Sequence, residues 1–178
     1  MVTYVWVEIV MLASLANRPS HGYELRQRVE QSLGTTLSNN SLYPTLRRFT
    51  EAGAVTRTPQ AQQGRPTRHV YEVTPVGLEM LHDMLAELPD ELAADQGEFM
   101  ARLANFDRLA VDERLAVLDA RARALLARVA RNDELVAGIE PDGWTRVVLD
   151  EVVRRTHTEL RWLDTLRVRA TSPLGGLT

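Results

Sequence analysis

One β-hairpin pattern, placed in sequence that is otherwise patterned as helix, sets the strongest limit on how this chain can fold. Residues 54–58 and 68–73 carry valine, threonine and tyrosine among polar residues, which is typical of short strands. The polar connector 59–67 contains glycine and proline, so we expect it to be a loop. Thr74 then offers an N-cap, and Pro75 suits the first position of a following helix. The pattern predicts a two-stranded hairpin followed at once by a helix.

Three helix patterns precede the hairpin. Residues 4–16 are apolar nearly all round, so we expect a helix that is buried on more than one side. The second pattern starts at Ser20 or His21, either of which can cap a helix, and runs to Leu33.

The third helix pattern begins among residues 38–41, all of which favour N-cap positions, and continues to Ala52, after which we expect Gly53 to end it. Pro44 lies close behind this start. Because proline is comfortable only in the first turn of a helix, we expect the cap to be Asn40 or Ser41.

The second half of the chain is patterned as helix near residues 98–106, 112–137 and 142–170. Apolar side chains recur at three-residue and four-residue steps in the last two helices, which is typical of packing seams. These positions are Leu115, Leu118, Ala122, Leu125, Val129 and Val136 in one helix and Leu149, Val152, Thr156, Leu163 and Leu166 in the other.

Charge is distributed unevenly along the chain. The net charge of −3 by itself disfavours a nucleic-acid partner. Residues 18–71, however, contain eight arginines and three acidic residues, a net charge of +5, whereas residues 89–178 contain 13 arginines and 16 acidic residues. Every one of these cations is arginine, the better bidentate partner for phosphate and guanine. The two halves therefore have different electrostatic characters.

Several classes of function are disfavoured by what the sequence lacks. No cysteine is present, which excludes disulfides, thiolate zinc sites and thiol nucleophiles. The four histidines show no metal-ligand spacing, so neither a metal nor another cofactor is expected. No nucleophile elbow, phosphate loop or dinucleotide fingerprint occurs, so we do not expect an enzyme. No apolar run is long enough to cross a bilayer, and the start lacks a basic flank, so we expect a cytoplasmic protein without a membrane partner.

Three helices, a hairpin and a fourth helix, in that order, describe a winged helix-turn-helix, whose third helix enters the major groove of DNA. The start of this helix is rich in amide, hydroxyl, phenol and guanidinium groups, which can read base edges and hold phosphates. The candidate DNA-binding residues are Asn39, Asn40, Ser41, Tyr43, Thr45, Arg47 and Arg48 in the helix and Arg65 and Arg68 at the hairpin.

Some of these residues have an alternative structural interpretation. Leu42 is expected in the core, whereas Tyr43 can either pack there or contact DNA, and we favour DNA. Arg65 and Arg68 can belong to a solvated loop, but an arginine near glycine at a hairpin tip can also enter the minor groove or hold phosphate. Arg47 and Arg48 cannot both point inward; we expect one to meet phosphate and the other to pair with Glu51.

Five stretches follow one another in order: residues 21–24 (HGYE), 41–48 (SLYPTLRR), 51–55 (EAGAV), 64–68 (GRPTR) and 71–77 (YEVTPVG). In these stretches the sequence resembles the PadR family of transcriptional regulators. The resemblance covers roughly residues 5–88 and implies a homodimer that represses transcription, often of neighbouring genes for detoxification, efflux or specialised metabolism, and releases DNA when a small molecule binds. Residues 98–103 also look like the opening of the longer C-terminal helical domain of one PadR subgroup.

We therefore expect a mainly α fold with two domains. Residues 1–89 would form the winged helix-turn-helix domain, residues 90–170 an α-helical domain for dimerisation and effector binding, and residues 171–178 a flexible tail. The expected partners are double-stranded DNA with an inverted-repeat operator, a second copy of the chain, and a small-molecule effector bound between the halves.

Aromatic residues suggest where such an effector could bind, because flat rings line apolar cavities well. The candidates are Trp6, Phe99, Trp144, His157 and Trp162. For Trp144 and Trp162 we favour a place in the dimer core, because apolar residues surround them at helical spacing.

A rival hypothesis from another class is a helical assembly protein whose winged domain docks protein instead of DNA, since that fold also serves protein contacts. An enzyme is a more distant alternative, since the second half lacks a polar constellation that could support catalysis.

Overall fold

The computed structural model describes residues 5–33, 39–62, 65–138 and 143–172. The chain divides into two compact units: unit 1 extends to Leu85, and unit 2 begins at Ala86. The fold is mainly α with one small antiparallel sheet, as predicted. No helix in the described ranges combines the length and the apolar character that crossing a membrane would require.

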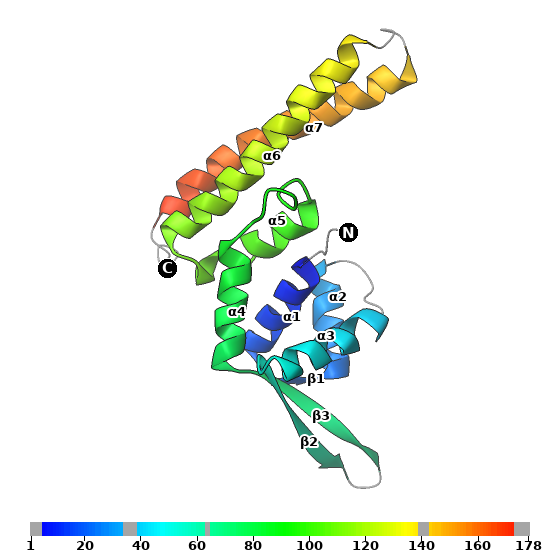
Figure 1. The fold of residues 1–178 in the computed structure, drawn as a ribbon, viewed down its shortest axis with the longest axis vertical. Coiled ribbons are helices and arrows are strands. Elements are labelled where there is room, and N and C mark those ends of the chain that lie inside the picture. The colour runs from blue at the N-terminus through cyan, green and yellow to red at the C-terminus, as the bar shows by residue number, and fades with distance from the viewer. Residues whose placement is uncertain (1–4, 34–38, 63–64, 139–142, 173–178) are drawn as a thin grey trace. The chain divides into compact units, whose positions relative to one another are not determined.

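Unit 1 has the element order of a winged helix-turn-helix, which confirms the predicted fold (Figure 1). The β2–β3 hairpin extends away from the three helices that precede it in this view. The elements are α1 (Trp6–Asn17), β1 (Ser20–His21), α2 (Gly22–Leu33), α3 (Asn39–Glu51), β2 (Val55–Gln62), β3 (Arg65–Val73) and α4 (Pro75–Ala86).

The core of unit 1 is built from the apolar positions of these helices. α1 contributes Ile9, Met11, Leu12 and Leu15, all at most 1% exposed, which agrees with a helix buried on more than one side. Leu42 of α3 is fully buried, as predicted. Each such side chain contributes about 1.5–3 kcal/mol relative to an exposed one, so this core holds α3 firmly by one face.

The sheet is larger than the sequence pattern predicted. Its strand order is β1-β3-β2, and both pairings are antiparallel. Most of the connector 59–67 is strand in β2 and β3, whereas residues 63–64 lie outside the described ranges. The prediction of a loop was wrong because it treated proline as a strand breaker. Pro59 lies on β2, an edge strand, where a residue without an N–H is tolerated. The two-residue strand β1 was not predicted at all.

The structure contradicts the predicted start of α3 and confirms its predicted end. The helix begins at Asn39, earlier than expected, so Pro44 lies in its second turn. There Pro44 has no N–H to donate to the carbonyl group of Asn40, and the rest of the helix has to compensate for that missing bond. Gly53 ends the helix as expected, with a positive φ of 72° that favours glycine.

Unit 2 consists of α5 (Gln96–Leu103), the short 3₁₀ helix η1 (Phe106–Arg108), α6 (Val111–Ala137) and α7 (Trp144–Thr171). The long helices α6 and α7 run antiparallel and pack against each other (Figure 1). Leu118, Leu125 and Leu163, which belong to the predicted seams, are at most 1% exposed. Much of both seams is therefore used within a single chain. Of the predicted tail, residues 173–178 lie outside the described part.

Buried arginines tie the helices of unit 2 together. Arg102 is 1% exposed and donates to the Glu98 carboxylate at 2.7 Å and to the carbonyl oxygen of Glu87 at 2.9 Å. Arg121 of α6 donates to the Glu159 carboxylate of α7 at 2.7 Å. Buried charges need such partners, because an unpaired one would cost several kcal/mol, on the order of 3–5.

Candidate nucleic-acid interface

The helix α3 presents one apolar face to the core and one polar face to solvent. Leu46 and Phe49 are buried, whereas Tyr43 is 48% exposed and Arg47 is exposed. Thr45 is 8% exposed, so the structure assigns it to the buried face. This corrects its selection as a DNA-contacting residue: a position between Tyr43 and Arg47 in sequence lies on another side of a helix.

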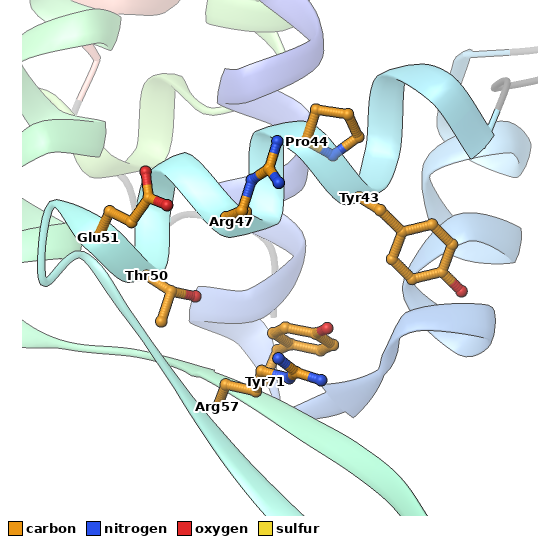
Figure 2. A pocket seen from close by; sticks show the side chains of 7 residues that line it. All are labelled: Tyr43, Pro44, Arg47, Thr50, Glu51, Arg57 and Tyr71. Atoms are coloured by element: carbon orange, nitrogen blue, oxygen red, sulfur yellow. The ribbon is translucent and has the colours of Figure 1, made fainter.

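A hollow of about 390 Å³ lies between α3 and the hairpin, and we call it the first hollow. Figure 2 shows the side chains of α3 on one side of it and those of Arg57 and Tyr71 on the other. Its lining thus combines guanidinium, phenol, hydroxyl and carboxylate groups, which can all form hydrogen bonds. The lining residues are Tyr43, Pro44, Arg47, Thr50, Glu51, Arg57 and Tyr71.

A second hollow, of about 300 Å³, lies beside the start of α2. Tyr43 and Tyr71 line both hollows. Nδ1 of His21 lies 3.1 Å from the carbonyl oxygen of His69, which links β1 to β3 next to this hollow. The lining residues are His21, Gly22, Tyr23, Glu24, Tyr43, Arg68, His69 and Tyr71.

Strand pairing positions the residues of the hairpin that border the hollows. Arg57 of β2 lies directly opposite Tyr71 of β3 in the antiparallel register. The Arg57 guanidinium also lies 3.2 Å from Nδ1 of His69. Residues directly opposite each other on two strands have neighbouring side chains, so those of Arg57 and Tyr71 lie next to each other on one face of the sheet.

Tyr71 has an unusual environment for a phenol. Its side chain is 8% exposed, and its hydroxyl has no hydrogen-bond partner among the described residues. Burial raises the pKa of Tyr71 above its ordinary value, because the charged phenolate would be poorly solvated, while the nearby positive charge of Arg57 acts in the opposite direction. The hydroxyl therefore stays protonated at neutral pH and is able to donate a hydrogen bond to a group entering the hollows.

The two adjacent arginines of α3 have different roles. Arg48 pairs with Glu8 of α1, although its side chain remains 59% exposed. Arg47 forms no ion pair with a described residue and lines the first hollow. The expectation that one of them pairs with Glu51 is corrected: the partner comes from α1, which sequence spacing within α3 cannot reveal.

The remaining predicted DNA-binding residues divide into two groups. Arg68 is exposed and lines the second hollow. The side chains of Asn39, Asn40, Ser41 and Arg65 lie outside the described part of the chain. Sequence reasoning missed Arg57, Tyr71, His69 and Thr50, because only strand register and the approach of the hairpin to α3 bring them to the hollows. The tyrosine and arginine content of the two strands was the only available signal.

The candidate effector residues do not form one cluster. In unit 2, the rings of Phe99 and Trp162 meet edge to face, with centroids 6.2 Å apart. Trp144 is 85% exposed and lies 18 residues before Trp162 on α7, a separation of about 27 Å along a helix, too far for one small pocket. His157 is exposed on the same helix, and Trp6 is half-buried on α1 of unit 1.

A shallow groove of about 340 Å³ runs beside Trp162 in unit 2. It is bordered by Gln96, Arg154, Arg155, Thr158, Glu159 and Trp162. Both arginines are also paired with Glu151, and their hydrogen bonds lower the pKa of the Glu151 carboxyl to about 2. Among the residues with described positions, no group of three or more histidines and carboxylates could hold a metal ion.

Comparison with known proteins finds similarity to transcriptional regulators. The sequence model described as "Transcriptional regulator PadR-like family" matches residues 11–83. The chain is 28% identical over 174 residues to the probable transcriptional regulator Rv1176c of Mycobacterium tuberculosis, with 86% of this chain and 92% of the relative covered.

Two solved structures are also similar. The structure of Bacillus subtilis PadR in complex with operator DNA is 20% identical, with 95% of this chain and 99% of that chain covered and a TM-score of 0.45. That of the putative transcriptional regulator TA0346 from Thermoplasma acidophilum is 28% identical, with coverages of 57% and 86% and a TM-score of 0.41.

Proposed function

We propose that this chain is a transcriptional regulator of the PadR-like family, whose sequence model matches residues 11–83, and that unit 1 binds double-stranded DNA sequence-specifically through α3 and the β2–β3 hairpin. One observation carries the proposal: Tyr43 and Arg47 on the exposed face of α3 lie across the first hollow from Arg57 and Tyr71 of the hairpin (Figure 2). Helix and hairpin thus offer one continuous polar surface to a duplex.

The cations on this surface suit the DNA backbone. Arg47, Arg57 and Arg68 are exposed, and Glu51 is the acidic residue that lines the first hollow with two of them. In this arrangement α3 would lie in the major groove, with Tyr43 and Arg47 toward base edges or phosphates, while the hairpin arginines follow the backbone. Such binding depends strongly on salt, because each neutralised phosphate releases counterions.

A mobility-shift titration with a duplex from the region upstream of the chain's own gene tests the proposal. Arg47→Ala and Arg57→Ala should each weaken binding roughly 5- to 100-fold, and each should reduce the slope of log affinity against log salt by about 1 if the arginine meets a phosphate.

Arg131→Ala is the matched control, because Arg131 is an exposed arginine of unit 2. Equal affinities for the wild type and both unit 1 variants would remove this surface from the model. If the wild-type protein binds no duplex, the result would contradict the proposal and favour the rival hypothesis, in which the winged domain docks protein.

We also propose that the protein acts as a homodimer on an inverted-repeat operator. Exposed apolar side chains near the start of α7 support this: Trp144, Val147 and Val148 are 85%, 53% and 61% exposed. Neighbouring apolar side chains of this size on one helix are costly to leave in water. A two-fold dimer would present two α3 helices to successive major grooves, about 34–36 Å apart.

The last part of the proposal follows from the resemblance to PadR proteins. A small molecule releases the protein from DNA. The regulated gene lies nearby and serves detoxification, efflux or specialised metabolism. The groove beside Trp162 supports a ligand with an aromatic ring, because an indole borders it. An anionic group on that ligand would compete with Glu151 for Arg154 and Arg155, which also border the groove. Salicylate is a suitable probe: binding there should quench the fluorescence of Trp162, and Trp162→Phe should abolish that change. A fluorescence change that persists in the variant would exclude this groove.

A further inference from the structure

The aromatic ring of Tyr43 lies against Gly22, the first residue of α2. A Cβ atom built on Gly22 would lie 3.2 Å from Cε1, 3.4 Å from Oη and 3.6 Å from Cζ of Tyr43, and these are its three nearest neighbours. Gly22 is itself buried. The hydrogen atom of this glycine therefore leaves room for one particular side chain, that of Tyr43.

Backbone conformation does not explain a glycine at this position. Among the described residues, Gly53 is the one glycine with a positive φ. An L-residue would thus fit the backbone at the start of α2. Space, and not conformation, is what the glycine supplies.

The ring that Gly22 accommodates occupies a central place in the proposed interface. Tyr43 lines both hollows: the first, between α3 and the hairpin, and the second, beside the start of α2. Its ring therefore borders both spaces. Because the side chain is 48% exposed, the ring can move without disrupting the core. A shift of the ring would change both hollows together.

We infer that Gly22 is a positioning residue for DNA recognition: by lacking a side chain, it lets the Tyr43 ring settle against α2 in the orientation in which it meets the duplex. The inference rests on the proposed function of unit 1. A methyl group at 3.2 Å is closer than an ordinary van der Waals contact, so the ring must move by a few tenths of an ångström. A valine side chain, which is larger, must move it further. The effect should therefore appear in DNA affinity and much less in stability.

A double-mutant cycle tests this inference with the full chain and the upstream duplex. Gly22→Ala and Gly22→Val should weaken binding by roughly 3-fold and 10- to 30-fold in the wild-type background, as expected for a contacting pair. In a Tyr43→Ala background, where the ring is absent, the same two substitutions should change affinity less than about 2-fold, within the limits of additivity.

Gly138→Ala in unit 2 is the matched control, because the nearest atom to its Cβ would be the carbonyl oxygen of Leu135 at 3.9 Å. The midpoint of urea unfolding should be the same or higher in Gly22→Ala than in the wild type. The NMR signals of the Tyr43 ring should shift in Gly22→Ala and remain in place in Gly138→Ala.

The outcomes separate this inference from the proposed function. Equal losses of affinity in both backgrounds, or ring signals that do not move, would overturn the role of Gly22 while DNA binding by unit 1 stands. Absence of any binding by the wild-type protein would instead refute the proposed function itself. Larger losses in the wild-type background, together with shifted ring signals, would support the inference.

Discussion

Tyr71 illustrates how a single side chain can connect the stability of unit 1 to its proposed interface. The residue is nearly buried, yet it lines both hollows, and its hydroxyl has no described partner. A phenol in this position contributes apolar contact through its ring and leaves one donor facing an approaching ligand. Its ionisation should therefore be unfavourable in the folded state.

The stability of unit 1 should decrease at alkaline pH because of Tyr71. Burial raises the folded-state pKa of this phenol above the value of about 10 that it has in an unfolded chain. The folded state holds this proton more tightly than the unfolded chain does. The stability that protonated Tyr71 contributes is therefore fully present below about pH 10 and is lost as the pH rises through the folded-state pKa.

Urea unfolding of the wild type and of Tyr71→Phe between pH 8 and pH 11 measures this contribution. We expect the free energy of unfolding to fall more steeply with pH in the wild type than in the variant, which has no hydroxyl to ionise. Parallel pH profiles for the two proteins would contradict the assignment.

At the scale of elements, the first turn of α4 fixes where the hairpin leaves the helical core. Thr74 Oγ1 accepts from the N–H of Gly77 at 3.1 Å, as predicted for an N-cap. It also donates to the carbonyl oxygen of Gly53 at 2.7 Å, which links the start of α4 to the residue that ends α3. At Gly77 the backbone of α4 approaches that of Ala54 very closely. A Cβ there would lie 2.1 Å from the Ala54 carbonyl oxygen and 2.7 Å from Cγ2 of Val73.

Gly77→Ala should therefore destabilise unit 1. The clash is with backbone, which cannot rotate aside, so α4 and the start of β2 have to separate; we expect a loss of about 1–3 kcal/mol, as for other overpacked sites. The loss is measured as a change in the urea unfolding midpoint. Gly138→Ala, whose Cβ would make only an ordinary van der Waals contact with the Leu135 carbonyl oxygen at 3.9 Å, should leave that midpoint almost unchanged. Equal stability of the two variants would show that α4 is not held this tightly.

At the scale of the whole molecule, the two units expose different kinds of surface. Unit 1 exposes arginines along α3 and the hairpin, whereas α7 of unit 2 exposes apolar side chains near its start. A regulator that binds an inverted repeat needs both a polar surface for the duplex and an apolar surface for a second copy. The proposed dimer assigns one of these surfaces to each unit.

Val148→Asp should convert the dimer to a monomer without unfolding α7. Val148 is 61% exposed, so a carboxylate is well solvated in the monomer but would be buried by a partner. We expect sedimentation to show half the mass of the wild type and DNA affinity to fall at least roughly 10-fold, because one half-site is then lost.

Thr165→Asp is the control for this substitution, since Thr165 is an exposed position about four to five turns further along α7. It should leave the mass unchanged. A wild-type protein that sediments as a monomer, or a Val148→Asp variant that remains dimeric, would contradict the proposed interface.

Local sequence patterns by themselves determined the helices, the hairpin, the glycine stop after α3 and the N-cap at Thr74, because each depends on side chains within a few residues of one another. The same is true of the buried position of Leu42 and of the family resemblance, which rests on short contiguous stretches. These features largely define the fold.

Tertiary structure decided which of the predicted side chains face the hollows. The pairing of Arg48 with Glu8, the burial of Thr45, the meeting of Arg57 with Tyr71 and the contact of Gly22 with Tyr43 all join segments whose relative placement depends on strand register and helix packing. Separation along the sequence carries no information about such contacts, because they form only when apolar burial has fixed the elements against one another.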